Sequence, residues 1–475
     1  MKTGAFVVSL VFVLTLMAFM APSARADWPQ YQGPNRDGIS PEKGLARSWP
    51  EDGPKTLWTV PLGIGFAAPA VVDGKVYILD RIEQVPDAPR KKSKPRGGGR
   101  GGNGQDRDDR DRNADNETKS KTVKGGKEKD VLRCLDLESG EELWKLEFDA
   151  PGKVGHNGSR TTPTVAEGHV YAVGVKGDLY CVDISERKLV WHRNIVKDFE
   201  VDKLSYGMAQ SPVVHGDLLL ISPQKGDTSV AALKRSNGET VWKAGKLGLG
   251  HYTLPVITTL DGVEQIVMIG SSDRKLENLG KIAGISLEDG KILWSIVTKW
   301  QCHLPIPHAL PLPEDRLFIT GGYKAGSVML QVKREGIFFK EFNAKELFAT
   351  MDCGSQIHQP LFYKDHIYAN SNSNEVQDGM ICMTLDGEVK WRTGKGGELP
   401  NFERGTLILA DDMIINLDGK TGKLHLIEPS PDKYRESAQA QVLGGKKIWA
   451  PMALSQGKLL LRDMKEMKCL DLRNP

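Results

Sequence analysis

The sequence predicts an all-β fold, an eight-bladed β-propeller of four-stranded antiparallel blades whose ring is closed by the N-terminal strand. Three observations predict it: a repeat of about fifty residues, a turn signal at the same place in every copy, and a last copy that lacks its final strand. Repeats of this kind form propellers because a closed ring leaves only short, protected sheet edges. We therefore expect the 475 residues to form one ring and not the three domains that length alone suggests.

Each copy of the repeat encodes four short strands. Residues 162–191 read TPTVAEGHVYAVGVKGDLYCVDISERKLVW, and residues 211–242 follow the same plan in different letters. Short stretches rich in Val, Ile, Leu and Tyr, bounded by Gly, Asp or Asn, are typical of β-strands. Eight openings follow one another along the chain: Ala68-Pro69, Thr162-Pro163, Ser211-Pro212, Leu254-Pro255, Leu310-Pro311, Gln359-Pro360, a degenerate one near Gly405-Thr406, and Ala450-Pro451.

The closing strand of most copies ends on a large aromatic residue. We expect this ring to be a structural wedge between neighbouring blades, with its N–H able to bond across the seam. The eighth copy stops at 469–471 without a closing strand, and residues 55–60 (KTLWTV) supply one from the other end of the chain. The predicted wedge residues are Trp58, Trp144, Trp191, Trp242, Trp294 and Trp391, with Phe339 in the fifth copy.

The six cysteines fall into two groups. Four occupy one slot of the third strand, where other copies have Ala232 or Gly284, so we expect buried structural thiols that act as small hydrophobes. Cys302 and Cys353 lie in loops, and a disulfide between them is left open. No Cys-x-x-Cys occurs, so a zinc site is not supported. The four cysteines of the shared slot are Cys134, Cys181, Cys382 and Cys469.

The first residues have the pattern of an export signal. Lys2 precedes an apolar run at 5–20, and Ala24-Arg25-Ala26 is a small-x-small cleavage site, which predicts a signal peptide over 1–26 and a mature propeller over 27–475. An uncleaved anchor is the alternative, although the run is shorter than the about 20 residues of a spanning helix. We expect a periplasmic or secreted protein without a lipid-anchor cysteine and without a transmembrane segment after cleavage.

A charged insert interrupts the first copy between its second and third strands. Residues 86–130 carry 14 Lys and Arg against 9 Asp and Glu, a net charge of +5, and almost no apolar residue. Such a segment buries too little apolar area to offset its ordering entropy, so we expect a disordered, solvated loop. Arg-Gly-Gly stretches bind nucleic acid in other proteins, but export argues against that partner. Binding to an anionic surface or polymer remains the alternative.

One glycine motif matches a cofactor fingerprint in the wrong context. Gly63-Ile64-Gly65-Phe66-Ala67-Ala68 fits G-x-G-x-x-A, but a strand follows where dinucleotide binding requires a helix. We expect the loop that leads into the first blade. There is no nucleophile elbow, phosphate-binding loop or H-E-x-x-H pattern, so no catalytic residue is predicted.

The candidate site lies on one rim of the ring. Loops after the second and fourth strands of a blade share one face, so the insert and the long connections between blades lie on the same side. Binding residues concentrate on loops held by a rigid scaffold, although any propeller mouth is polar and histidines there often bond backbone. The spacing predicts no metal site. The candidates for ligand or partner binding are Arg160, Tyr206, His251, Tyr252, His308, His358 and Arg404.

The repeat resembles the pyrroloquinoline-quinone (PQQ) repeat, best at 66–79 with 131–144, at 160–191 and at 281–294. The start of the mature chain, DWPQYQGPNRDG, looks like that of exported PQQ-like propellers common in planctomycete-type bacteria. Quinoprotein alcohol and glucose dehydrogenases share such a ring and bind PQQ with calcium at its axis. They carry an adjacent cysteine pair, an aspartate base and a Glu/Asn/Asp calcium set. No Cys-Cys pair occurs here, and no matching PQQ or calcium ligand set is recognisable.

The chain also resembles the BamB-type outer-membrane assembly factor, a propeller that scaffolds protein contacts without a cofactor. We therefore expect a monomeric, non-catalytic scaffold that binds a protein or anionic polymer through its loop-rich rim, with a role in envelope or outer-membrane protein assembly implied by the resemblance. The alternative is a PQQ-dependent oxidoreductase, similar to an alcohol or sugar dehydrogenase, with PQQ and calcium. A third reading is that the mouth binds a sugar or another small ligand.

Overall fold

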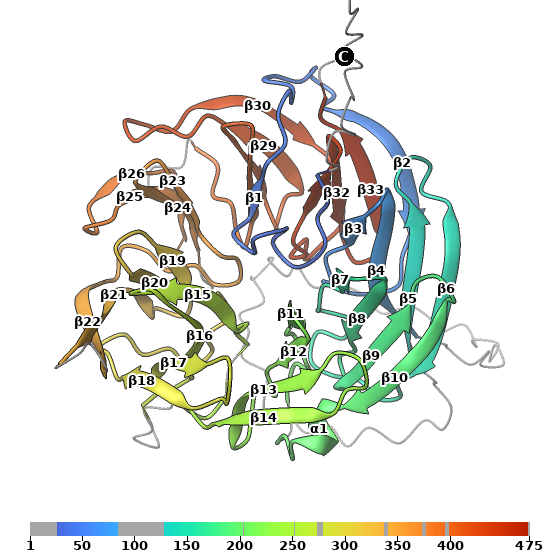
Figure 1. Ribbon diagram of the computed structural model, residues 1–475. Coiled ribbons are helices and arrows are strands. Elements are labelled where there is room, and N and C mark those ends of the chain that lie inside the picture. Colours follow the sequence, from blue (N-terminus) through green and yellow to red (C-terminus); the bar gives the residue numbers. More distant parts are fainter. Residues whose placement is uncertain are drawn as a thin grey trace, which may run out of the picture.

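Eight β-sheets surround a central axis, which confirms the predicted eight-bladed propeller (Figure 1). The computed structural model describes residues 26–83, 128–202, 204–250, 252–272, 279–336, 341–372, 377–394 and 399–473. Within each blade neighbouring strands pair antiparallel, and in seven blades the four strands follow one another in chain order. The predicted openings directly precede or begin the innermost strand of each blade.

The blades are numbered from the first complete sheet. Blade 1 holds β3 (Ala70–Val72), β4 (Lys75–Glu83), β5 (Glu128–Asp136) and β6 (Glu142–Asp149). Blade 2 holds β7 (Thr164–Ala166), β8 (His169–Val173), β9 (Asp178–Asp183) and β10 (Lys188–Asn194). Blade 3 holds β11 (Val213–His215), β12 (Leu218–Ile221), β13 (Thr228–Lys234) and β14 (Thr240–Gly245). Blade 4 holds β15 (Val256–Leu260), β16 (Val263–Ile269), β17 (Ile282–Ser286) and β18 (Ile292–Ile296).

The second half of the ring repeats the plan. Blade 5 holds β19 (Leu310–Leu312), β20 (Arg316–Gly321), β21 (Gly326–Glu335) and β22 (Glu341–Thr350). Blade 6 holds β23 (Leu361–Tyr363), β24 (His366–Asn372), β25 (Gln377–Thr384) and β26 (Val389–Arg392). Blade 7 holds β27 (Thr406–Ala410), β28 (Met413–Leu417), β29 (Lys423–Ile427) and β30 (Glu436–Gln441). Blade 8 holds β31 (Ala453–Ser455), β32 (Lys458–Arg462), β33 (Glu466–Asp471) and β2 (Lys55–Pro61).

The N-terminal strand closes the ring, as the sequence predicts. Strand β2 pairs antiparallel with β33, and Trp58 lies opposite Cys469. The short β1 (Ile39–Ser40) adds to the inner edge of blade 7 in parallel with β27. One short helix, α1 (Ile195–Asp198), follows blade 2, and the Asn194 side chain caps it by accepting a hydrogen bond from the Lys197 N–H.

The closing aromatic residues lie at the seams between blades. The ring of Trp58 packs on the turn of blade 1 at Gly140, where a Cβ would come within 2.7 Å of the indole, so the turn has no room for a side chain. At four seams the indole N–H donates to a carbonyl of the next blade, over 2.8–3.0 Å: Trp58 to Leu137, Trp191 to Arg235, Trp242 to Leu287 and Trp391 to Ser430. Trp294 instead donates to Gln265 of its own blade, and Trp144 contacts Tyr77.

The prediction of Phe339 for the fifth blade was wrong. The closing position of this blade, opposite Met329, is occupied by Phe348. The Phe348 ring packs on Gly387 in the turn of blade 6, just as the Trp58 ring packs on Gly140 in the turn of blade 1. Strands β21 and β22 are ten residues long, longer than the corresponding strands of the other blades. The longer hairpin moves the closing position further along the chain than the repeat period suggests.

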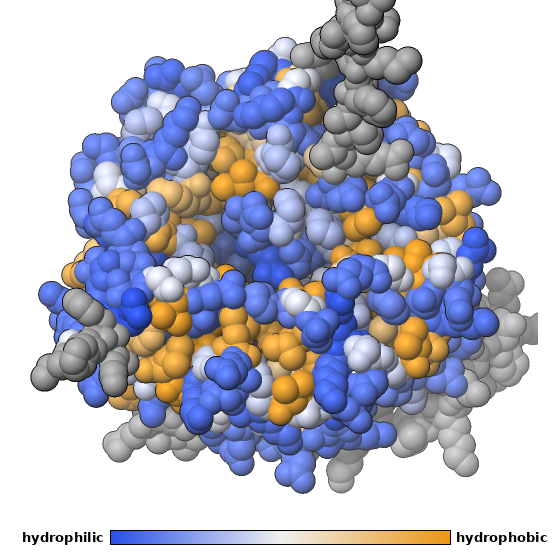
Figure 2. Space-filling model, in the orientation of Figure 1, coloured by the Kyte–Doolittle hydropathy of each residue, from blue (hydrophilic) through white to orange (hydrophobic). Residues whose placement is uncertain are grey.

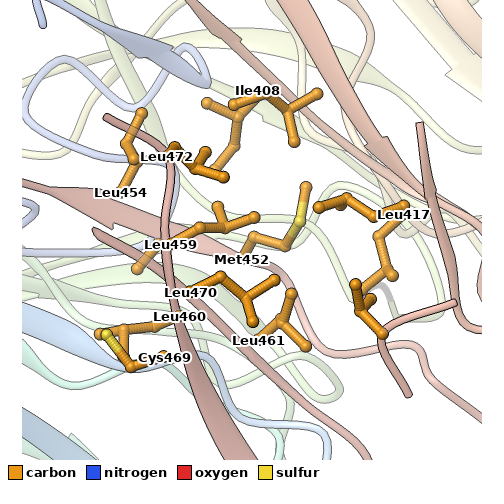
Figure 3. Packing of buried hydrophobic residues seen from close by; sticks show 14 of the residues in the cluster. Ile408, Leu417, Met452, Leu454, Leu459, Leu460, Leu461, Cys469, Leu470 and Leu472 are labelled. Carbon is orange, nitrogen blue, oxygen red and sulfur yellow. The ribbon is translucent and has the colours of Figure 1, made fainter. Parts of the chain in front are cut away.

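The core between blades is aliphatic. Figure 3 shows the packing between blades 7 and 8, where Leu459 and Leu461 of β32 lie near Ile408 and Met452. All six cysteines are buried and unpaired, Cys302 and Cys353 included. Their burial raises the pKa of each thiol, to about 11 at Cys134.

A segment before the first blade crosses the central channel. Residues 28–40 bond the inner strands of blades 1, 2, 3 and 7, through pairs such as Trp28 with Val71 and Arg36 Nη2 with the Val214 carbonyl, 2.9 Å away. These contacts fall on the middle residues of β3, β7 and β11 and on the later residues of β27. Segment 28–40 therefore runs along the inner edges of these four blades. Figure 1 shows β1 on the inner side of the ring.

Two predicted segments fall largely outside the described residues. The signal peptide at 1–26 does so except for its last residue, and the insert at 86–130 does so except for 128–130, which belong to β5. No helix among the described residues is long and apolar enough to cross a membrane.

Candidate functional site

Aromatic and cationic side chains from six connections meet at one mouth of the channel. They come from the loop into blade 1 and from the connections that follow blades 1, 2, 3, 6 and 7. We call them the mouth cluster: Phe66, His156, Arg160, Tyr206, Tyr252, Arg404, Lys447 and Trp449. Figure 2 shows a hollow at the centre of the face drawn, with hydrophilic residues on its floor.

Glycines bring the first two loops of the cluster together. Gly65 pairs with Ser159 in a parallel bridge, and the Phe66 N–H donates to the Ser159 carbonyl over 2.6 Å. A Cβ on Gly65 would lie 2.3 Å from the Ser159 hydroxyl, so only glycine permits this approach. The motif that resembled a dinucleotide fingerprint is thus a loop-packing motif, and it places Phe66 beside Arg160.

Arg160 is held by backbone and not by carboxylates. Its guanidinium lies over the Phe66 ring, 5.0 Å from the centroid, and donates to the carbonyls of Tyr206, Gly155 and His156. In the part of the chain that the structure describes, no carboxylate lies within ion-pair distance of it. Burial lowers its pKa to about 10, because the charged form loses water without gaining a counter-ion.

Trp449 is the centre of the cluster. Its ring stacks on Phe66, with centroids 5.5 Å apart and planes inclined by 16°. The Arg404 guanidinium lies 4.9 Å from its centroid and the Lys447 ammonium 5.9 Å. Cations over indole faces gain electrostatic attraction from the ring quadrupole, so Trp449 gathers two positive charges at the mouth.

A second group of rings extends the cluster toward blade 3. His156 stacks on Tyr206 at 5.8 Å and meets Trp449 edge-on at the same distance, while Tyr252 lies 6.4 Å from Tyr206. The Lys447 ammonium is 3.1 Å from Nδ1 of His156. Tyr206 is 40% exposed, which makes it more open to a partner than Phe66, Tyr252 and Trp449.

The polar groups beneath the rings come from blades 5 and 6. Arg404 donates to the Gln356 side chain over 3.2 Å and to Glu403 over 3.0 Å, and Glu403 is also paired with Lys420. Burial raises the pKa of the Tyr323 hydroxyl, with a hydrogen bond to Gln356 opposing it. The one carboxylate beside Arg404 is therefore already shared by two cations.

His358 lies in the channel wall below Trp449. It is 5% exposed, and neither of its ring nitrogens has a hydrogen-bond partner among the residues described. Burial lowers its pKa to about 4, against a smaller opposing effect of the Trp449 backbone. The neighbouring Gln359 amide is buried and unpartnered as well. Buried polar atoms without protein partners are typical of channels that hold water or a ligand.

The structure brings together only part of the predicted set. Arg160, Tyr206, Tyr252 and Arg404 belong to the mouth cluster. His358 lies below it, and His308 faces Tyr31 of segment 28–40, with ring centroids 5.8 Å apart. Burial lowers the pKa of His308 to about 4. His251 is outside the described residues.

Several residues of the cluster have left-handed backbone. His156, Arg404 and Lys447 have φ values of 47°, 52° and 59°, and Tyr323 has 57°. This conformation is uncommon for residues with a side chain and costs on the order of 1 kcal/mol each. The surrounding structure therefore fixes these side chains at the mouth, which preorganises the cluster.

The mouth does not fit a quinone–calcium pair. Among the described residues, no group of three or more His, Cys, Asp or Glu side chains could hold a metal ion. Phe66 and Trp449 already stack on each other, so a flat ring cannot enter between them without displacing one. The charged groups over the faces of these two rings are cations, whereas calcium prefers carboxylate oxygens. No redox step is derived from this site.

Sequence reasoning missed Phe66, Lys447 and Trp449 as members of the site, although a signal for two of them exists. Phe66 stands three residues before an opening proline, as Arg160, Tyr252 and His308 do, and Trp449 stands two residues before one, as His358 does. Trp449 is therefore a tryptophan outside the closing position, which distinguishes it from the wedge residues.

Over part of its length, the chain is similar in sequence to PQQ-like, BamB-like β-propellers. A family model described as outer membrane protein assembly factor BamB matches residues 127–302. The BamB of Xanthomonas campestris is 31% identical over 120 residues, which are 25% of this chain and 29% of that protein. The BamB of Moranella endobia is 24% identical over 172 residues, 35% of this chain and 38% of that protein. The matches thus span about a third of these relatives.

A solved structure shares the complete ring. The quinohemoprotein alcohol dehydrogenase of Comamonas testosteroni superimposes with a TM-score of 0.55 at 12% identity, covering 95% of this chain and 81% of that one. At this identity the likeness concerns the fold alone.

Proposed function

We propose that this chain is an exported, non-catalytic propeller that binds a protein partner through the mouth rim and acts as a scaffold in the bacterial envelope, in outer-membrane protein assembly. The observation that carries the proposal is the mouth cluster itself. Tryptophan, tyrosine and arginine are the residue types that dominate binding energy at protein interfaces, and here they gather on one rim with a preorganised backbone.

The scaffold role is supported by the way the ring holds these residues. They come from connections far apart in the chain, such as His156 and Lys447, 291 residues apart. Each connection is anchored at both ends by a blade, so the loops present a fixed surface. The relatives bear the name outer membrane protein assembly factor, which agrees with a role in assembly.

Capture from the native envelope tests the proposal. The full chain is immobilised beside a variant with Tyr206→Ala and Lys447→Ala and a matched control with Tyr363→Ala and Lys364→Ala. The control pair also stacks a lysine on a tyrosine, at 4.8 Å, and lies in the turn after β23 on the opposite rim. The proposal expects a protein retained by wild type and control and lost from the mouth variant.

Two results would contradict the proposal. One is retention by the mouth variant equal to that by wild type. The other is tight uptake of PQQ with calcium by the purified chain, followed by dye reduction with an alcohol or a sugar, which would assign the ring to the oxidoreductases.

A further inference from the structure

We propose that the mouth cluster recognises acidic residues of an extended segment in the partner protein, with carboxylates on Arg160, Arg404 and Lys447. The inference rests on the proposed function and names the chemistry of the same site. It begins with an imbalance of charge. Arg160 and Lys447 form no ion pair with a carboxylate in the described ranges, and the single carboxylate at Arg404 is shared with Lys420.

The geometry leaves donors available to a carboxylate. The hydrogen bonds of Arg160 engage Nε and Nη2, so Nη1 makes none among the described residues. Lys447 is exposed, and among the described residues its ammonium contacts a ring nitrogen and an indole face and no carboxylate. Charge-assisted bonds to carboxylate are the strongest hydrogen bonds that these groups form. An acidic partner would also supply the counter-ion that the half-buried Arg160 lacks among the described residues.

The spacing of the cations fits an extended chain. The two guanidinium groups cover the Phe66–Trp449 stack, Arg160 on Phe66 and Arg404 on Trp449, each about 5 Å from its ring centroid. An extended strand rises about 3.3 Å per residue and presents every second side chain on one face. Acidic residues two to four places apart could therefore reach both guanidinium groups.

The same observations disfavour nucleic acid. Single-stranded nucleic acid binds to aromatic platforms on which bases stack. Here Phe66 is covered by Trp449 and Arg160, and Trp449 is covered by Phe66 and the two other cations. Tyr206 already stacks on His156. The cationic groups of the cluster are therefore more accessible to a ligand than its ring faces are. This arrangement favours binding of carboxylates over stacking of bases.

Fluorescence anisotropy with defined probes tests the inference. The probes are a fluorescein-labelled peptide of alternating Glu and Ala, the same peptide with Gln in place of Glu, and a labelled oligothymidine. We expect the Glu peptide to bind and the Gln peptide to bind at least about tenfold more weakly, as the loss of a charge-assisted contact implies. Added NaCl should weaken the Glu complex.

A pair of variants localises the binding. Lys447→Gln removes a mouth charge, and Lys188→Gln removes an exposed charge from the start of β10 on the opposite rim. Both chains should keep the wild-type thermal unfolding midpoint. We expect Lys447→Gln to weaken the Glu peptide about threefold or more and Lys188→Gln to leave it unchanged. Equal binding of the Glu and Gln peptides, tighter binding of oligothymidine, or equal effects of the two variants would overturn the inference.

The failures of the two proposals are distinguishable. If the mouth rim captures an envelope protein but the Glu peptide neither binds nor displaces it, the acidic-segment inference is wrong and the scaffold proposal stands. If the Glu peptide binds at the mouth but no envelope protein depends on it, the scaffold proposal is the one that fails.

Discussion

The indole N–H of Trp58 donates to the Leu137 carbonyl across 2.9 Å, and this bond joins the last blade to the first. The two residues lie 79 positions apart in the chain, and the bond forms only when β2 completes blade 8. The seam that closes the ring is therefore built like the seams inside it, with a tryptophan packed on the glycine turn of the next blade.

The closing seam predicts a stability difference between two equal substitutions. Trp58→Phe leaves the buried Leu137 carbonyl without its donor, and we expect a loss of about 1–3 kcal/mol in the free energy of unfolding. Trp144→Phe removes the same atoms from a ring whose Nε1 has no hydrogen bond among the described residues, so its loss should be smaller. Urea unfolding of both variants checks this, and equal losses would contradict it.

A buried ion pair at the root of the insert predicts a second difference. Arg81 and Asp130 are both 0% exposed and lie 2.9 Å apart. Asp130→Asn leaves the buried Arg81 charge with backbone carbonyls but without its counter-ion, which should cost about 3–5 kcal/mol. The exposed pair of Lys129 and Glu147 has the same separation, and Glu147→Gln should barely move the urea midpoint. Similar shifts for the two variants would refute this account of the pair.

Burial of His358 predicts a pH dependence. Its pKa is about 4 in the folded protein and about 6.5 in the unfolded chain, so the unfolded state binds more protons between these values. Its contribution to stability is complete above pH 6.5 and falls as the pH falls toward 4, by on the order of 2 kcal/mol at pH 5.

A glutamine at the same position isolates this effect. Asp130 acts in the opposite direction, because burial raises its pKa to about 6, so the wild-type curve alone does not report on His358. The urea midpoint of His358→Gln should fall less than that of wild type between pH 7 and pH 5. Parallel curves for the two proteins would show that His358 is not buried as a neutral base.

The thiols predict a simple titration. All six cysteines are buried and unpaired, and burial raises their pKa values. A thiol reagent should therefore react slowly with the native protein and with six groups in urea. If only four thiols react in urea, two of the six cysteines form a disulfide. Cys302 and Cys353 are then the candidates, because the other four cysteines occupy equivalent positions in separate blades.

Much of the fold follows from the sequence because every blade repeats the same local signals. The opening prolines, the polar-glycine turns and the unpaired strand at 55–60 predict eight blades and their closure. Phe348 was missed because the longer β21–β22 hairpin shifts the closing position. Segment 28–40 carries no repeat, so its path across the channel depends on contacts with inner strands that only the closed ring brings together.

The site is less accessible to sequence reasoning. The rim could be located because loop positions alternate between the two faces of a blade. The contacts within the cluster depend on loops from opposite ends of the chain, as in the stack of Phe66 on Trp449. Their pairing is decided by the curvature of the ring and by the close approach of Gly65 to Ser159, neither of which a single repeat encodes.

The most direct test of the central claim is photo-crosslinking in the native envelope. A benzophenone amino acid at position 206 reports on the mouth, and one at position 363 reports on the opposite rim. We predict a discrete protein adduct from position 206 that weakens with Lys447→Gln, and none from position 363. An adduct from position 363 alone, or one from position 206 that is indifferent to Lys447→Gln, would contradict the assignment of the mouth as the partner-binding surface.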